Sequence, residues 1–210
     1  SLSLVGDIVL GSNIEPAYPY EATNIFLPKP NPFKNVRPFL KNSHLVIGNL
    51  EAPICEQKFL PYDKGPNTYS FRTPPYAIKS LKNAPFHILH IANNHIFDCK
   101  GSGFKRTLEH LKKANIKPLG LYKPRRYVPE IPNSFSEKTL IMKINNITIG
   151  FLGFSTRDVF KNINDLKNTK KTINNASKIC DILIVSFHGG AEGSHATRVQ
   201  IKTEIYANEK

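Results

Sequence analysis

The chain has 210 residues, a length that suits one large domain or two small ones with a buried core. Its 40% hydrophobic and 10% aromatic content, with 12 glycines and 16 prolines, excludes disordered, collagen-like and coiled-coil proteins. No apolar run approaches the roughly 18 residues of a membrane span, and no signal peptide is visible. Because Ser1 is not a natural start, we do not assign a compartment from these absences.

The charge balance favours anionic partners. Lysine and arginine total 29 against 16 acidic residues, a formal net charge of +13, and such a field attracts acidic polymers, phosphorylated molecules or nucleic acid. The basic residues are scattered, with no basic helix and no aromatic-basic ribonucleoprotein motif, so nucleic acid is not expected. A composition rich in lysine, asparagine and isoleucine is the alternative explanation for the charge.

Three cysteines, Cys55, Cys99 and Cys180, lie far apart with no C-x-x-C pair. An odd number at such spacing predicts structural thiols and gives no sign of zinc or redox chemistry. Cys180 heads an apolar strand and is predicted to lie in the core. Cys99 borders the most polar loop and is the cysteine that we expect to be exposed.

The first half of the chain predicts three strands separated by irregular segments and one short helix. The strands are apolar runs bounded by glycine, proline or asparagine, whereas the proline-rich segments exclude regular structure. The strands are expected at residues 2–10, 44–49 and 86–92, the irregular segments at 16–32, 51–75 and 93–103, and the helix from Pro74-Pro75 to Lys82.

The second half begins with an amphipathic helix over residues 104–114, where Phe104, Leu108 and Leu111 recur at helical spacing. A hairpin is expected around Asn145-Asn146, a pair that tolerates positive φ, between strands at 138–143 and 147–154. A second helix near 166–179 then leads into a strand at 181–187. Strands and helices alternate without an internal repeat, which predicts one layered α/β domain.

Polar side chains follow the predicted strands at the points where the strands end. Asp7 lies in the first strand, Glu51 just past the second, Asn94 and His95 past the third, and His188 after the last. The carboxyl ends of strands in an α/β sheet form the ligand crevice, so these side chains are expected to converge. Carboxylate, amide oxygen and imidazole ligands suit manganese, iron or zinc.

Simpler interpretations remain open at each position. Asp7 could be a turn residue, Asn94 and His95 could belong to a plain turn, and His188 could cap its strand. His87 and His90 lie within the third strand, so packing or surface roles are predicted for them.

Six ordered blocks resemble the poly-γ-glutamate synthesis protein CapA family, within the calcineurin-like metallophosphoesterase superfamily. The blocks span nearly the whole chain. They are GDIVLG at 6–11, GNLEAP at 48–53, KGP with YSFRTPP through 75, IANNHIFD at 91–98, GFLGFS at 150–155 and VSFHGGAEGS at 185–194.

This resemblance implies a sandwich of two mixed sheets flanked by helices, with a two-metal site at the strand ends. Asp7 would bind the first metal, Glu51 would bridge, and Asn94 and His188 would bind the second. His95 would transfer protons. Two cations held by a bridging carboxylate activate water and stabilise a phosphoryl or acyl transition state.

Three further residues receive roles beside this metal set. Asp98 could orient the ring of His95, which makes His95 and Asp98 the candidate catalytic residues. Arg72 is a candidate clamp for an anionic substrate because its planar fork matches phosphate or carboxylate. Glu192 lies where the family keeps an acidic residue and is a second candidate for substrate binding.

Two departures from the resemblance shape the expectations for metal. Val9 stands where the wider superfamily has a histidine, and the chain ends at Lys210 before a Gly-His-x-His block that relatives carry. We therefore expect residues 1–210 to form a single domain that is incomplete at its C-terminus. A divalent metal (Mn, Fe or Zn) is expected to be absent or weakly bound, and an exposed strand edge is expected to support a homodimer.

Two functions fit these observations. One is a metal-dependent hydrolase acting on a phosphoester or on an amide of an anionic polymer; the other is a non-catalytic module that binds or exports such a polymer. The resemblance implies a cell-envelope biosynthesis complex on the extracytoplasmic side, with the protein anchored by a part that this chain does not contain.

Overall fold

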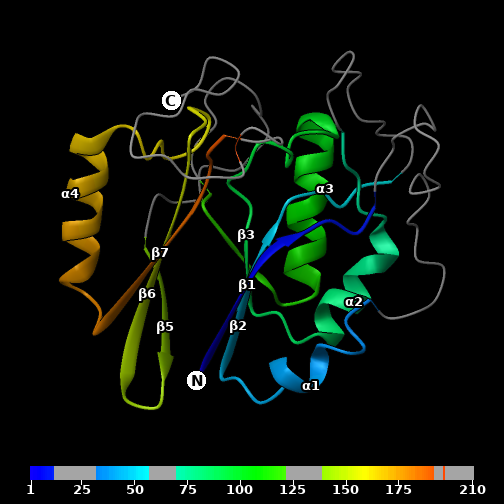
Figure 1. The fold of residues 1–210 in the computed structure, drawn as a ribbon, viewed down its shortest axis with the longest axis horizontal. Coiled ribbons are helices and arrows are strands. Elements are labelled where there is room, and N and C mark those ends of the chain that lie inside the picture. The colour runs from blue at the N-terminus through cyan, green and yellow to red at the C-terminus, as the bar shows by residue number, and fades with distance from the viewer. Residues whose placement is uncertain (12–31, 57–69, 122–138, 192–195, 197–210) are drawn as a thin grey trace.

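A computed structural model describes residues 1–11, 32–56, 70–121, 139–191 and 196. The described residues form two sheets with helices on both outer sides (Figure 1). The first sheet has the order β1-β2-β3-β4 and is parallel throughout, with strands β1 (Leu2–Ile8), β2 (Leu45–Leu50), β3 (Ile88–His90) and β4 (Lys117–Leu119).

The second sheet is mixed. Strand β6 (Ile147–Ser155) pairs antiparallel with β5 (Leu140–Ile144) and parallel with β7 (Ile182–His188). The helices are α1 (Arg37–Leu40), the 3-10 turn η2 (Pro75–Ala77), α2 (Ile78–Asn83), α3 (Lys100–Lys113) and α4 (Leu166–Ser177). None of the described helices is long and apolar enough to cross a membrane.

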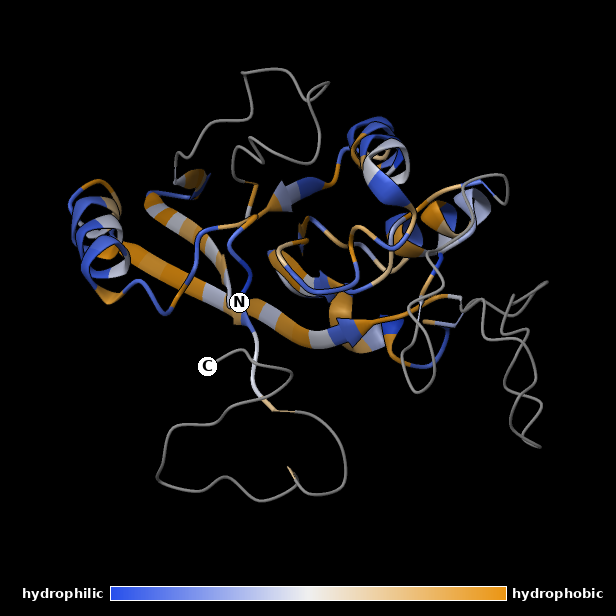
Figure 2. Cartoon of the chain, turned by 90° about the horizontal axis from the view of Figure 1, so that it is seen from above, coloured by the Kyte–Doolittle hydropathy of each residue, from blue (hydrophilic) through white to orange (hydrophobic). Residues whose placement is uncertain are grey.

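The layers follow from which face of each strand is apolar. One face of the first sheet packs with α1, α2 and α3, through residues such as Val46, Leu89 and Leu111. Its opposite face packs on the second sheet in one buried cluster that includes Ile47 from β2 and Phe151 from β6. The outer face of the second sheet packs on α4, and Figure 2 shows apolar strands between helices with hydrophilic outer sides. The predicted layered α/β fold is confirmed.

Most predicted elements are present, with shifted ends. The hairpin turns at Asn145, whose φ of 54° is the left-handed conformation expected there. Helix α3 begins at Lys100, four residues before the expected start, so the segment 93–103 is only partly irregular. Strand β4 was not predicted. Residues 16–31 and 57–69, which belong to two of the segments expected to be irregular, lie outside the described residues.

The prediction of free thiols throughout was wrong. Cys55 and Cys99 form a disulfide, and both are fully buried, so Cys99 is not the exposed cysteine. Cys99 immediately precedes α3 and faces inward against Gly103, where it meets Cys55. Cys180 is the free thiol among the described cysteines and is only partly buried, not a core residue.

The pairing of β1 with β2 contains a register shift. Leu4 lies opposite Ile47, and Asp7 lies opposite Asn49. Strand β1 therefore has two residues between these pairs, where β2 has one. This irregularity adds one residue to β1, as a β-bulge does, and it re-aims the side chains that follow it. Asp7 therefore shares a register position with Asn49 at the end of the sheet.

Candidate metal centre

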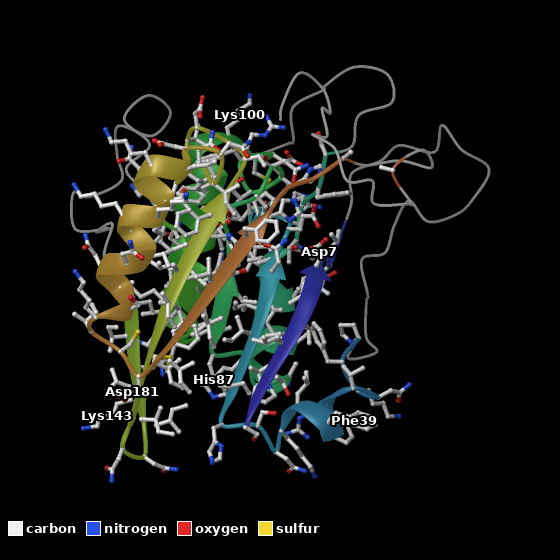
Figure 3. All side chains as sticks on the ribbon, turned by 60° about the vertical axis from the view of Figure 1, so that its left-hand side comes forward. Asp7, Phe39, His87, Lys100, Lys143 and Asp181 are labelled. Atoms are coloured by element: carbon white, nitrogen blue, oxygen red, sulfur yellow. A yellow bond between two sulfur atoms is a disulfide. The ribbon has the colours of Figure 1, made fainter. Side chains whose placement is uncertain are left out.

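The predicted site residues come together at the carboxyl ends of the strands. In Figure 3, Asp7 and Lys100 lie toward one end of the molecule, and Asp181 and Lys143 lie at the other. The end with Asp7 is where parallel strands bring their C-terminal residues together. Glu51 follows β2 and is held beside β1, because its backbone N–H donates to the carbonyl of Ile8 at 3.1 Å.

His188 is the centre of the cluster. Its Nε2 lies 2.9 Å from Oδ1 of Asn94 and 3.5 Å from Oε1 of Glu51, and its Nδ1 lies 3.8 Å from Oδ1 of Asp7. Ligand atoms of Asp7, Glu51 and His188 all lie within 4.8 Å of one another. Four chain segments therefore deliver Asp7, Glu51, Asn94 and His188 to one point, which is the convergence that the sequence predicts.

Asn49 lies between two of these side chains. Its Nδ2 donates to Oδ1 of Asp7 at 2.7 Å and lies 3.1 Å from Nδ1 of His188. An amide nitrogen is only a donor, so Nδ1 of His188 accepts here, and Nε2, which faces Asn94 and Glu51, is the nitrogen that would give up its proton to bind a metal. The ring orientation of His188 thus depends on Asn49, a residue for which the sequence predicts no role.

Asn93 sets the orientation of Asn49. The Oδ1 of Asn93 accepts from the backbone N–H groups of His95 at 3.2 Å and Ile96 at 2.9 Å. Its Nδ2 donates to the carbonyl of Leu50 at 2.9 Å and to Oδ1 of Asn49 at 3.0 Å. Backbone groups therefore fix the Asn93 amide, and that amide leaves Asn49 with its NH₂ group facing the site.

His95 and Asp98 form a buried pair beside the cluster. Nδ1 of His95 lies 2.8 Å from Oδ2 of Asp98, whose side chain is 1% exposed. The same oxygen accepts from the backbone N–H of Phe71 at 2.7 Å, and the Phe71 ring lies against the imidazole with centroids 4.2 Å apart. A carboxylate at Nδ1 holds the ring in the tautomer that leaves Nε2 unprotonated.

His90 links the two sheets beneath the site. It is 1% exposed, and its Nδ1 lies 2.6 Å from Oγ of Ser186 on β7. Burial, together with the nearby His188, lowers the pKa of His90 to about 4. His90 is therefore a neutral packing residue, consistent with its prediction as a residue outside the ligand set.

Of the two residues predicted to bind substrate, Arg72 is described by the structure and Glu192 is not. Arg72 is 6% exposed, its Nη1 donates to the carbonyl of Cys55 at 3.4 Å, and burial lowers the pKa of its guanidinium. Its side chain therefore contributes to the packing of the loop beside the site. Glu192 lies outside the described residues.

The donor set fits a divalent metal. Ligand atoms bonded to one ion at about 2.0 to 2.2 Å lie about 2.8 to 3.6 Å apart at octahedral or tetrahedral angles. The separation of 3.5 Å between His188 and Glu51 is close to that spacing. Carboxylate, imidazole and amide oxygen suit manganese, iron or zinc equally, so the geometry does not select among these metals.

Asn49 and Asn93 were not predicted as site residues, although the sequence around each gives a weak indication. Asn49 lies within β2 two residues before Glu51, so both side chains leave the strand on the same face. Asn93 precedes Asn94 in a turn that follows β3, and a turn asparagine commonly accepts backbone hydrogen bonds. Neither observation distinguishes a positioning residue from a structural one without the contacts.

Known proteins resemble this chain over nearly its whole length. The family described as "Bacterial capsule synthesis protein PGA_cap" matches residues 1–205. The chain is 30% identical over 204 residues to the "PGA biosynthesis protein CapA" of Bacillus subtilis (strain 168), covering 91% of this chain and 49% of that protein.

A second relative is the "Capsule biosynthesis protein CapA" of Bacillus anthracis. It is 27% identical over 155 residues, covering 74% of this chain and 34% of that protein. The chain thus spans about half or less of the length of the curated relatives that it matches.

Proposed function

Because the chain belongs to the family of bacterial capsule synthesis proteins, we propose that it acts in the synthesis of a cell-envelope capsule, with a divalent metal bound in its crevice. The observation that carries the metal proposal is the convergence of Asp7, Glu51 and His188 from three segments of the chain. The relatives are named for capsule or PGA biosynthesis, which supports an envelope role.

We propose that the site hydrolyses a phosphoester or a related anionic bond. Asp7, Glu51, Asn94 and His188 would hold the metal, which when bound would supply a Lewis acid and an activated water. His95, oriented by Asp98, would transfer a proton at its Nε2. The clamp role of Arg72 and the substrate role of Glu192 stay predictions.

Metal titration together with a generic phosphodiester assay tests this proposal. The chain should bind Mn²⁺ and cleave the diester, whereas Glu51→Gln and His188→Ala should lose both properties. Glu109→Gln is the matched control, because that carboxylate pairs with Arg106 on α3, away from the site. Binding and turnover that survive in Glu51→Gln would overturn the proposed ligand set.

A binding module for an anionic polymer is the second candidate, favoured by the net charge of +13. Such a module would retain poly-γ-glutamate in a salt-dependent manner and would show no diester cleavage with any metal. A hydrolase would show metal-dependent cleavage even where polymer binding is weak.

A homodimer through exposed strands stays a prediction. Strands β1 and β7 end their sheets among the described residues, and Leu4 on β1 is 62% exposed and Phe187 on β7 60% exposed. Unpaired strand edges with apolar side chains favour association. Light scattering over a range of concentrations tests it, and a strictly monomeric mass would contradict it.

A further inference from the structure

The Cys55–Cys99 disulfide joins two segments that carry different parts of the candidate site. Cys55 lies four residues after Glu51, and Cys99 directly follows Asp98. We propose that this disulfide is a positioning cross-link, which holds Glu51 and the His95–Asp98 pair in register. The metal-binding part of the inference rests on the proposed function; the cross-link itself does not.

The surroundings of the two sulfur atoms leave room for the disulfide. Cys55 and Cys99 are both fully buried. A Cβ at Gly103 would clash with the Cβ of Cys99 and would lie 3.4 Å from the Cβ of Cys55. The absence of a side chain at Gly103, in the first turn of α3, therefore leaves the room in which the two cysteines meet.

Non-covalent contacts also join the Glu51 segment to α3, through Thr107 and through the ion pair of Arg106 with Glu56. The backbone N–H of Ile54 donates to Oγ1 of Thr107 at 2.8 Å. The backbone N–H of Cys55 donates to the carbonyl of Thr73 at 3.1 Å, which ties the segment to a third stretch of chain. The disulfide adds the covalent link between this segment and the residues next to Asp98.

Formation of the bond is a two-electron oxidation. The thiols of Cys55 and Cys99 lose two protons and two electrons and form the S–S bond. The electrons pass to a disulfide oxidant, such as oxidised glutathione or a thiol–disulfide oxidoreductase, which is reduced to two thiols. Bonds of this kind persist in oxidising compartments, so full assembly of the site would follow export from a reducing one.

Peptide mapping tests the bond itself. The 210-residue chain is refolded in a glutathione buffer of oxidising poise, alkylated and digested. We expect one linked peptide pair containing Cys55 and Cys99, with Cys180 alkylated. Alkylation of all three cysteines would overturn the proposal.

Amide hydrogen exchange tests the positioning role. In Cys55→Ala/Cys99→Ala we expect faster exchange at residues 48–56 and 91–103 than in the matched control Cys180→Ala, with β5 and β6 unchanged. Should the double variant fail to fold, reduction of the folded wild-type chain gives the same comparison. Equal exchange in oxidised and reduced protein would show that the bond positions nothing.

Mn²⁺ titration connects the cross-link to the site. Loss of the disulfide should weaken Mn²⁺ binding about tenfold or more, the effect typical of losing a support of metal ligands. Equal affinity with and without the bond would overturn the coupling. If the oxidised wild-type chain bound no Mn²⁺, the proposed function would fail, while mapping and exchange would still decide the cross-link.

Discussion

Nδ2 of Asn93 donates to Oδ1 of Asn49 at 3.0 Å, and this contact turns the NH₂ group of Asn49 toward the site. Asn49 in turn donates to Asp7 and faces His188. The positions of two candidate ligands thus depend on the amide of Asn93 through the side chain of Asn49.

Asn93→Asp should therefore disturb the site without altering any ligand. One oxygen of the new carboxylate still accepts from backbone, but the other would face the carbonyl of Leu50 and Oδ1 of Asn49. A buried acceptor without a donor costs about 1 to 3 kcal/mol in the free energy of unfolding, and more when charged. Mn²⁺ affinity should fall about 10-fold to 100-fold.

Chemical denaturation and metal titration measure these two effects. Asn175→Asp, at an exposed position on α4, is the matched control and should leave both quantities unchanged. Wild-type affinity in Asn93→Asp would show that Asn49 keeps its orientation without Asn93.

Asp98→Asn is expected to lower hydrolase activity and also stability. Asp98 is 1% exposed and one of its oxygens accepts from both Phe71 and His95, so its replacement affects the packing of the fold as well as the ring of His95. An uncharged acceptor in that place should cost about 1 to 2 kcal/mol in the free energy of unfolding. Diester turnover should fall while Mn²⁺ affinity stays near the wild-type value. A proportional loss of metal binding and turnover would instead make Asp98 a support of the metal set.

Stability should decrease as the pH falls between about 6.5 and about 4 because of His90. Its pKa in the fold is about 4, below the ordinary value of 6.5, so in this interval the unfolded chain takes up a proton that the folded chain does not. At 1.36 kcal/mol for each pKa unit, the contribution lost is at most about 3 kcal/mol.

Urea unfolding at a series of pH values measures this slope. His90→Gln should flatten the dependence across that interval, and His44→Gln, at an exposed histidine, should not. A wild-type slope in His90→Gln would assign the pH dependence to other groups.

Lys100→Gly should be neutral or stabilising. Lys100 has a φ of 60°, the left-handed conformation that disfavours residues with a Cβ, directly after Cys99. Glycine relieves a penalty of about 1 to 2 kcal/mol but adds backbone entropy to the unfolded chain. Asn145→Gly is the comparison, because asparagine accepts this conformation readily and less strain is relieved there. Thermal unfolding decides it; a loss of stability greater than that of Asn145→Gly would mean that the Lys100 side chain contributes contacts.

The strands that sequence predicted best are those with long apolar runs. Strand β4 was missed because it has only three residues and includes Pro118, which cannot donate to a sheet. It lies at the end of the first sheet, where a proline is tolerated. The start of α3 was missed because Gly101, Ser102 and Gly103 are poor helix formers, and Gly103 is accounted for by the disulfide packed against it.

The sequence was sufficient to predict which side chains lie at the strand ends and that their types could bind a metal. Residue identity and strand polarity suffice to place Asp7, Glu51 and His188 at one edge of the sheets. The disulfide was not predictable, because widely spaced cysteines do not reveal their pairing. The roles of Asn49 and Asn93 depend on which amide atom faces which neighbour, and only three-dimensional contacts give that information.

The extra residue in β1 decides where Asp7 points. Side chains on a strand alternate between faces, so pairing Leu4 with Ile47 without a bulge would set Gly6, not Asp7, opposite Asn49. Gly6 has no atom within 4 Å of where its Cβ would be, and the insertion is accommodated there without a clash. The extra residue between Leu4 and Asp7 therefore decides that a carboxylate, and not a glycine, lies opposite Asn49 at the edge of the crevice.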